Sequence, residues 1–230
     1  MAEGEENKEE IRKKQHVMFV FVLIFFSLQM VNAERSEKPW RPESGKHFVL
    51  IHGACLGAWS WYKQVQRLKS AGHNVTALDL AASGIDPKQV KDVPSISVEP
   101  FMVSLPSHER VIMVGHSLGG LAISPAIERF PEKIYVAVFV TALMSGKHTA
   151  RHCNDDMLVV IVRRQESILD SRYTYDDGPN NPPTTFILGP LFSATNVFQP
   201  SPIEDLALAM LLLRPLRLYS DKDMSKVLML

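Results

Sequence analysis

The chain has 230 residues, of which 46% are hydrophobic and 22% are charged, an ordinary composition for a globular protein. Lys and Arg number 25, and so do Asp and Glu, so no net charge would draw the protein to nucleic acid or to an anionic membrane surface. Two cysteines, Cys55 and Cys153, are too few for a disulfide framework and lack zinc-ligand spacing. These counts favour a small or neutral partner.

The N-terminal 33 residues differ in kind from the rest of the chain. Three basic residues at 12–14 precede the apolar run 17–28, and small residues follow at 31 and 33. This order is typical of a secretory signal peptide, and the apolar run is short for a bilayer span. We expect 1–33 to be cleaved, which would place the protein in the secretory pathway or outside the cell. An uncleaved membrane anchor, or an extension without a role on a cytoplasmic protein, stays open.

Residues 34–45, which contain two prolines, are predicted to be a linker, and the domain is predicted to span 46–230. In this domain short apolar runs alternate with segments of helical spacing. Such alternation indicates a parallel sheet covered on both faces, the α/β class. The predicted strands are His47–Ile51, Asn74–Leu78, Arg110–Val114 and Tyr135–Val140, and the predicted helices between them are Trp59–Ala71 and Leu121–Phe130.

After about residue 145 the pattern changes to helical stretches separated by Pro-rich turns. Its clearest helix is Ser201–Leu213, with Ser201 as the N-cap, Pro202 at the first helical position and Pro215 beyond the end. We expect residues 146–220 to be an insertion over the carboxyl edge of the sheet, where open α/β sheets bind ligands.

The motif Gly115-His116-Ser117-Leu118-Gly119 stands directly between a predicted strand and a predicted helix. This is the context that the G-x-S-x-G nucleophile elbow requires. The sharp turn holds the serine hydroxyl at a helix N-terminus, where the helix dipole favours developing negative charge. The sequence therefore predicts that Ser117 is a nucleophile.

A second motif, His52-Gly53-Ala54, ends the first predicted strand. In a sheet of this kind that strand lies beside the strand leading into the elbow, so the two loops meet. The backbone N–H groups of Ala54 and Leu118 could then bind one oxyanion, as acyl transfer requires. The alternative is that Gly53 only lets the chain turn.

These motifs resemble those of the plant methylesterase and hydroxynitrile lyase family, within the α/β-hydrolase superfamily. The resemblance rests on residues 52–59, 76–84 and 114–120 and continues through 175–179 and 201–207. It implies an α/β-hydrolase fold, mostly parallel with helices on both faces, and a lid at about 146–220. It also implies a serine carboxylesterase that needs no cofactor or metal and hydrolyses methyl esters of small acids such as salicylate, jasmonate or indole-acetate. Membrane contact would come only through residues 1–33.

The triad, however, is incomplete in this sequence. A serine needs a histidine to take its proton and a carboxylate to orient that histidine, in the chain order Ser, Asp, His. After Ser117 the only histidines are His148 and His152, and no aspartate lies between Ser117 and either of them. In the family the acid and the histidine follow the lid, so we expect an inactive member without the C-terminal strands and helices. The stretch 87–106, which supplies a covering helix in the family, is short, and the fourth strand should expose an apolar edge.

Several alternatives remain open at this point. His116 is expected to pack away from Ser117 rather than act as its base, and His148 or His152 could serve as a non-standard base for a working esterase. The acidic pairs at 155–156 and 176–177 are expected to be surface or turn residues. From a different class, the chain could be a non-catalytic binding protein for a small carboxylic acid or ester. A chain that does not fold stably is the last hypothesis.

Overall fold

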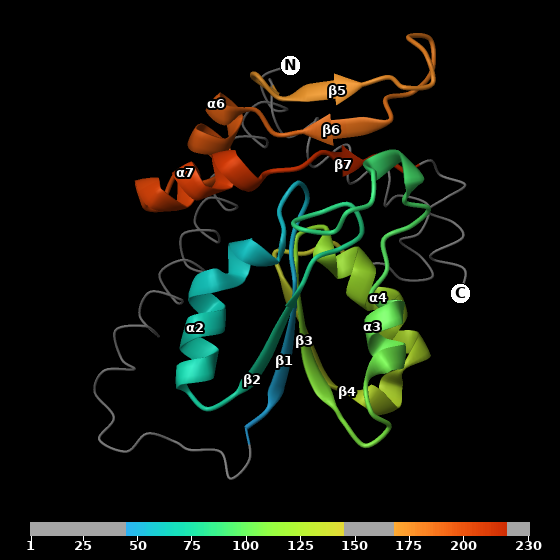
Figure 1. Ribbon diagram of the computed structural model, residues 1–230, viewed down its shortest axis with the longest axis vertical. Helices are drawn as coiled ribbons and strands as arrows, with labels where there is room; N and C mark the ends of the chain where they lie inside the picture. Colours follow the sequence, from blue (N-terminus) through green and yellow to red (C-terminus); the bar gives the residue numbers. More distant parts are fainter. Residues whose placement is uncertain (1–44, 145–167, 220–230) are drawn as a thin grey trace, which may run out of the picture. The chain divides into compact units, whose positions relative to one another are not determined.

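A four-stranded parallel sheet forms the centre of the computed structural model (Figure 1). The structure describes residues 45–144 and 168–219, all within Glu43–Leu230, one of the two units into which the chain divides. The strands lie in the order β2-β1-β3-β4, and every neighbouring pair is parallel. Their bounds are β1 His47–Ile51, β2 Asn74–Leu78, β3 Val111–His116 and β4 Ile134–Val140. These strands confirm the predicted strands and the α/β class. Near-continuous apolar runs suit strands that are covered on both faces.

Helices lie on the two faces of this sheet, with α2 on one side and α3 and α4 on the other (Figure 1). The predicted helix from Trp59 divides into a 3-10 turn, η2 Ala58–Trp61, and α2 Tyr62–Ser70. The predicted helix after the elbow is α4 Gly119–Arg129, which begins two residues earlier than Leu121. Two short 3-10 turns, η3 Val90–Asp92 and η4 Pro131–Lys133, join the elements.

The stretch 87–106 keeps a covering helix in spite of its shortness. Helix α3, Glu99–Ser104, forms there, and its Met102 side chain is fully buried. Val93, Ile96 and Val98 pack into the same core. Part of this face of the sheet is therefore covered by a few well-placed apolar side chains.

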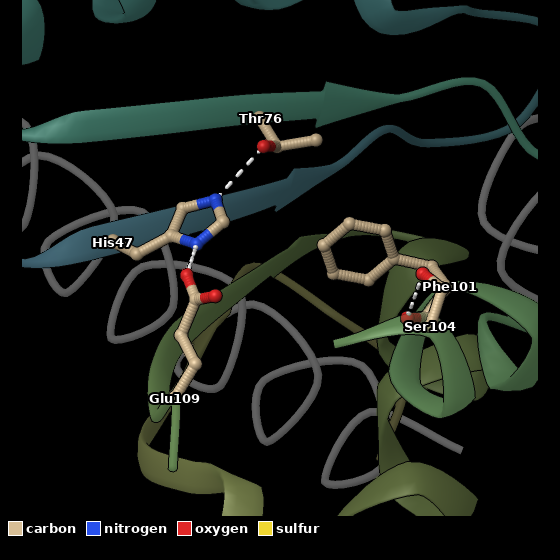
Figure 2. A network of polar contacts seen from close by, with 5 residues as sticks. All are labelled: His47, Thr76, Phe101, Ser104 and Glu109. Carbon is tan, nitrogen blue, oxygen red and sulfur yellow. Dashed lines mark hydrogen bonds and ion pairs between the residues drawn. The ribbon is translucent and has the colours of Figure 1, made fainter. Parts of the chain in front are cut away.

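The amino-terminal end of the sheet is joined by a polar network around His47 (Figure 2). The Nδ1 atom of His47 lies 2.5 Å from Oε1 of Glu109, and its Nε2 atom lies 2.8 Å from Oγ1 of Thr76. These contacts tie β1 to β2 and to the turn before β3. Because His47 is the first residue of β1, the network lies at the end of the strands opposite to Ser117, which follows the last residue of β3.

A second layer, residues 168–219, is named the cap here. It contains a three-stranded antiparallel sheet in the order β5-β6-β7. Its elements are β5 Arg172–Thr174, β6 Thr185–Ile187, α6 Pro190–Phe192, the π-turn η6 Ser193–Val197, α7 Ile203–Leu212 and β7 Leu216–Arg217. The short strands were not predicted, because three-residue segments carry too little periodicity to be recognised.

The helix predicted at Ser201–Leu213 forms as α7, but its predicted N-cap is wrong. Helix α7 begins at Ile203, Pro202 is the N-cap residue, and no side chain caps the helix. The carbonyl of Pro202 accepts the N–H of Asp205 at 3.0 Å, while Pro202 itself has an extended backbone. The proline therefore precedes the first helical residue instead of being that residue.

Several predictions fall on residues that the structure does not describe. They concern the signal segment 1–33, most of the linker 34–45, the first part of the predicted lid, and the histidines His148 and His152. These predictions stay predictions. Among the helices that are described, none is long and apolar enough to cross a membrane.

Candidate functional site: a serine elbow beside an exposed turn

Ser117 occupies a strained turn between β3 and α4. Its φ angle is 50°, in the left-handed region that residues other than Gly, Asn and Asp seldom adopt. Three backbone hydrogen bonds hold it there: Ser117 N–H donates to the carbonyl of Val140 at 3.2 Å, and its own carbonyl accepts from Gly120 at 3.2 Å and from Leu143 at 3.0 Å. A strained residue held so firmly by its surroundings is typical of a functional position.

The elbow is crowded, so the residues next to it have to be small. A Cβ atom at Gly120 would lie 1.9 Å from the carbonyl oxygen of Leu143. A Cβ atom at Gly53 would lie 3.1 Å from Cβ of Ser117 and 2.9 Å from Nδ1 of His116. The expected meeting of the two loops is confirmed. Gly53 does not have a positive φ angle, so close approach to the elbow, rather than the turn itself, explains its lack of a side chain.

Ala54 and Leu118 occupy equivalent places in two turns. In the first turn, the N–H of Leu56 donates to the carbonyl of Gly53 at 3.3 Å, and Cys55 has a φ angle of 60°. In the second, the N–H of Gly120 donates to the carbonyl of Ser117. Ala54 and Leu118 each follow the residue whose carbonyl accepts the turn's hydrogen bond. Each is therefore the first central residue of a β-turn, and its own N–H takes no part in that hydrogen bond.

Both amides lack a hydrogen-bond acceptor in the part of the chain that the structure describes. Within residues 45–144 and 168–219, neither the N–H of Ala54 nor that of Leu118 donates to another group. Leu118 is also the N-cap residue of α4, where the helix dipole favours negative charge. Two unused N–H groups on turns that meet at a serine can stabilise an oxyanion.

The described histidines do not supply a base for Ser117. No described side chain hydrogen-bonds to the Ser117 hydroxyl. His47 and His73 lie by the amino-terminal ends of the strands, and His108 is exposed in the turn before β3. His52 is buried and both of its ring nitrogens are already engaged, as described below.

His116 directly precedes Ser117, and the prediction that its ring packs away from the hydroxyl stays a prediction. Its ring lies edge-on to Trp61, with centroids 6.3 Å apart, and its Nδ1 faces Gly53. Burial lowers the pKa of His116, which keeps the imidazole neutral. The geometry gives this side chain a packing role between η2 and the turn at Gly53.

The cap contacts the turn after β1 directly. The N–H of Arg214 donates to the carbonyl of Cys55 at 3.1 Å, and Sγ of Cys55 lies 3.5 Å from the carbonyl oxygen of Phe186. Burial raises the pKa of the Cys55 thiol to about 11, so this cysteine stays protonated and acts as a weak donor rather than a nucleophile. The cap therefore braces the turn that carries Ala54.

Two further residues that hold these loops were not singled out by sequence reasoning. Oδ1 of Asp79 accepts the N–H of Ala58 at 2.6 Å and Oδ2 accepts the N–H of Ile85 at 3.1 Å. The guanidinium of Arg214 donates to the backbone carbonyls of Gly84, Asp86 and Lys88. For Asp79, the available signal was an acidic residue directly after a predicted strand, at the start of the segment Asp79-Leu80-Ala81-Ala82-Ser83-Gly84. For Arg214 the sequence offered no signal, because the loop that it contacts lies more than a hundred residues away.

A narrow cavity lies behind the turn, lined among others by Gly53, Leu118, Ser83 and Arg217. Its volume is about 30 Å³, room for roughly two waters. Among the described residues, no group of three His, Cys, Asp or Glu side chains is placed to hold a metal ion.

A parallel sheet with helices on both faces and a strained serine at a strand–helix turn are features of the α/β-hydrolase fold. The model of the "Alpha/beta hydrolase family" matches residues 48–225. The chain belongs to this family and is of the plant methylesterase type.

Individual relatives agree with this assignment. The chain is 50% identical over 186 residues to methyl jasmonate esterase 1 of Vitis vinifera, covering 79% of this chain and 70% of that protein. It is 43% identical over 191 residues to salicylic acid-binding protein 2 of Nicotiana tabacum, covering 80% and 72%. A crystal structure of a variant of tomato methylketone synthase I complexed with β-ketoheptanoate is 53% identical, with a TM-score of 0.75 over 81% of this chain and 73% of that one.

Proposed function

We propose that the chain carries the nucleophile and oxyanion part of a methylesterase site, with Ser117 as nucleophile and the N–H groups of Ala54 and Leu118 as the oxyanion hole. The observation that carries this proposal is the pair of equivalent turns, which bring two unused amides to a strained serine. Such preorganised donors stabilise the tetrahedral intermediate of ester hydrolysis without reorganisation during the reaction.

We propose further that the 230-residue polypeptide hydrolyses esters poorly. A serine hydroxyl is a weak nucleophile until a base takes its proton, and no described histidine is placed to do so. General base catalysis by a positioned side chain typically contributes about 10²–10⁴ in rate. A loss of that size is therefore expected relative to an esterase with a complete triad.

The relatives support a class of substrate for this proposal. Their names refer to methyl jasmonate and to salicylic acid, both small carboxylic compounds. A methyl ester of a small plant acid, with salicylate, jasmonate and indole-acetate as candidates, would place its carbonyl oxygen between Ala54 and Leu118. No cofactor is required for this chemistry, because the nucleophile and the oxyanion donors all come from the chain.

The direct test is a hydrolysis assay with methyl salicylate, methyl jasmonate and methyl indole-acetate, run beside Ser117→Ala as the matched control. We expect slow hydrolysis or none, and binding of at least one ester or acid by calorimetry. Any hydrolysis that survives in Ser117→Ala does not come from this site and would contradict the proposal.

Two alternatives predict other outcomes of the same assay. A working esterase with a non-standard base should lose activity in both Ser117→Ala and His148→Ala. A non-catalytic binding protein for a small carboxylic acid or ester should show saturable binding that Ser117→Ala leaves intact. The free amides of Ala54 and Leu118 are the observation that favours this second reading, because they would bind a carboxylate oxygen as well as an oxyanion.

A further inference from the structure

His52 is fixed in one tautomer by its surroundings. Its Nδ1 atom lies 2.8 Å from the carbonyl oxygen of Gly53, which can only accept a hydrogen bond. Its Nε2 atom lies 3.1 Å from the backbone N of Leu80, which can only donate. The proton must therefore be on Nδ1, and Nε2 must be the acceptor. Oγ of Ser83 lies 2.8 Å from the same Nε2.

The hydrogen bond to Gly53 fixes the orientation of the next amide. The peptide between Gly53 and Ala54 is planar and trans, so its C=O and N–H groups point in opposite directions. The carbonyl is held on one side by the imidazole of His52 and by the N–H of Leu56. The N–H of Ala54 is thereby directed to the other side of the peptide. A rotation of this peptide would remove the amide from the oxyanion hole.

We propose that His52 is a positioning residue that holds the N–H of Ala54 in place for the oxyanion by fixing the carbonyl of Gly53. This inference rests on the proposed function, in which Ala54 is an oxyanion donor. His52 acts through the peptide and does not touch the substrate, since its two nitrogens are engaged by Gly53 and by Leu80 with Ser83. The residue is 3% exposed.

The charge state of His52 agrees with this role. Burial is the largest cause that lowers its pKa, and the nearby His116 lowers it further, whereas the carbonyl of Gly53 and Asp79 oppose the shift. A protonated ring would also place a second N–H against the N–H of Leu80. The neutral Nδ1–H form is the one that both contacts require.

Two substitutions of His52 test the hydrogen bonds of its two ring nitrogens separately. In His52→Asn, the side-chain amide lies at the δ position and can still donate to Gly53. In His52→Gln, the amide lies at the ε position and can only replace the contacts with Leu80 and Ser83. Both variants lose the aromatic ring, so the loss of packing is similar and the hydrogen bond to Gly53 is the main difference. His108→Gln is the control, because His108 is exposed and lies before β3.

The first test is NMR of ¹⁵N-labelled full-length protein. Long-range proton–nitrogen correlations should show a protonated Nδ1 and an unprotonated Nε2 at His52. The amide resonance of Ala54 should stay near its wild-type position in His52→Asn and move clearly in His52→Gln. A proton on Nε2, or equal displacement of the Ala54 resonance in both variants, would overturn the inference.

The second test is the rate at which a fluorophosphonate modifies Ser117 in the presence of imidazole, followed by intact mass. Oγ of Ser117 bonds to phosphorus, fluoride leaves, imidazole takes the hydroxyl proton, and the phosphoryl oxygen occupies the oxyanion hole. Removing one oxyanion donor costs about 10²–10³ in rate, so a misdirected donor should slow His52→Gln by about tenfold or more, with His52→Asn within about threefold of wild type.

Thermal unfolding separates this effect from general damage. Equal slowing of both variants, in step with equal losses of thermal midpoint, would contradict the positioning role. If the wild-type protein is not modified even with imidazole, the proposed function fails, and the NMR measurement still decides whether His52 orients the peptide.

Discussion

Strands β1 and β4 are both runs of apolar residues, yet they lie in different environments. In β1, Val49, Leu50 and Ile51 are at most 1% exposed, whereas in β4 Tyr135 is 55% exposed and Val138 is 39% exposed. Strand β1 lies between β2 and β3, while β4 is bordered, among the described strands, by β3 alone. An apolar run therefore predicts a strand, but its neighbours decide how deeply it is buried.

Both strands nevertheless lead to the site. Strand β1 leads into the turn that carries Ala54, and the end of β4 supports the elbow. Val140 accepts the N–H of Ser117, and Leu143, just beyond the strand, donates to the carbonyl of Ser117. The carboxyl-terminal end of β4 is thus held firmly even though its outer side chains are exposed.

The largest expected loss of stability comes from a substitution that breaks the contact between the elbow and the segment that ends β4. Gly120→Ala would place a Cβ atom 1.9 Å from the backbone oxygen of Leu143, which cannot give way without moving the elbow. We expect a loss of about 3 kcal/mol in the free energy of unfolding, measured by urea denaturation.

Gly72→Ala is the matched control for this substitution. Gly72 has a φ angle of 87° but no atom within 4 Å of an added Cβ. Only backbone strain should act there, with a cost of about 1–2 kcal/mol. Equal losses in the two variants would show that crowding at the elbow is not the cause.

The second prediction compares the strands themselves with one chemical change. Val49→Ala removes two methyl groups from a fully buried site and should cost about 2 kcal/mol, while Val138→Ala at a partly exposed site should cost less than about 1 kcal/mol. Urea denaturation of both variants measures the difference. Similar losses would mean that β4 is as well packed in solution as β1.

The third prediction concerns pH, because the buried His52 follows β1 and the half-buried His116 ends β3. Burial lowers the pKa values of His52 and His116, so the unfolded chain binds protons that the folded chain does not as the pH falls below about 6.5. The thermal midpoint should therefore fall between pH 7 and pH 5.5, and the fall should be shallower in His52→Asn. A midpoint that is constant or rises over this range would contradict the assignment of neutral histidines.

The smallest expected effect loosens the cap. Asp205 on α7 accepts hydrogen bonds from Tyr62 at 2.5 Å and from Lys63 at 2.6 Å on α2. The hydrogen bond from Lys63, and to a smaller extent the one from Tyr62, lowers the pKa of Asp205. The contact between α7 and α2 should therefore weaken only in acid, as the pH falls through that lowered value.

Asp205→Ala should raise hydrogen exchange in α7 with little change in overall stability, since an ion pair at a partly exposed site contributes little. Glu204→Ala is the neighbouring control. Equal hydrogen exchange in the two variants would show that the contacts of Asp205 with Tyr62 and Lys63 do not hold α7.

Much of this fold could be predicted from the sequence. Strands of near-continuous apolar residues, the helix after Gly119 and the elbow at Ser117 all have strong local patterns, and each formed within one or two residues of its predicted place. The approach of Gly53 to Ser117 was expected from the strand arrangement of the fold that carries the G-x-S-x-G elbow. These features are local, or depend on a single topological rule.

The rest depends on contacts that no local pattern records. The cap strands are only two or three residues long, and the bracing of Cys55 by Arg214 and Phe186 joins segments distant in sequence. The hydrogen bonds of His52 depend on the packing of the loop after β2 against the turn after β1. The sequence placed His52 in the motif, but only the structure shows what its two nitrogens do.

The central claim is that the nucleophile and the oxyanion hole are formed while the described residues provide no base. It is tested most directly by the rate at which a fluorophosphonate modifies the native protein, with and without imidazole and with Ser117→Ala as the control. The account predicts slow modification in buffer and faster modification at Ser117 when imidazole supplies the base. Rapid modification without imidazole would reveal a base within the chain, and no modification with imidazole in a cooperatively melting sample would contradict the preformed site.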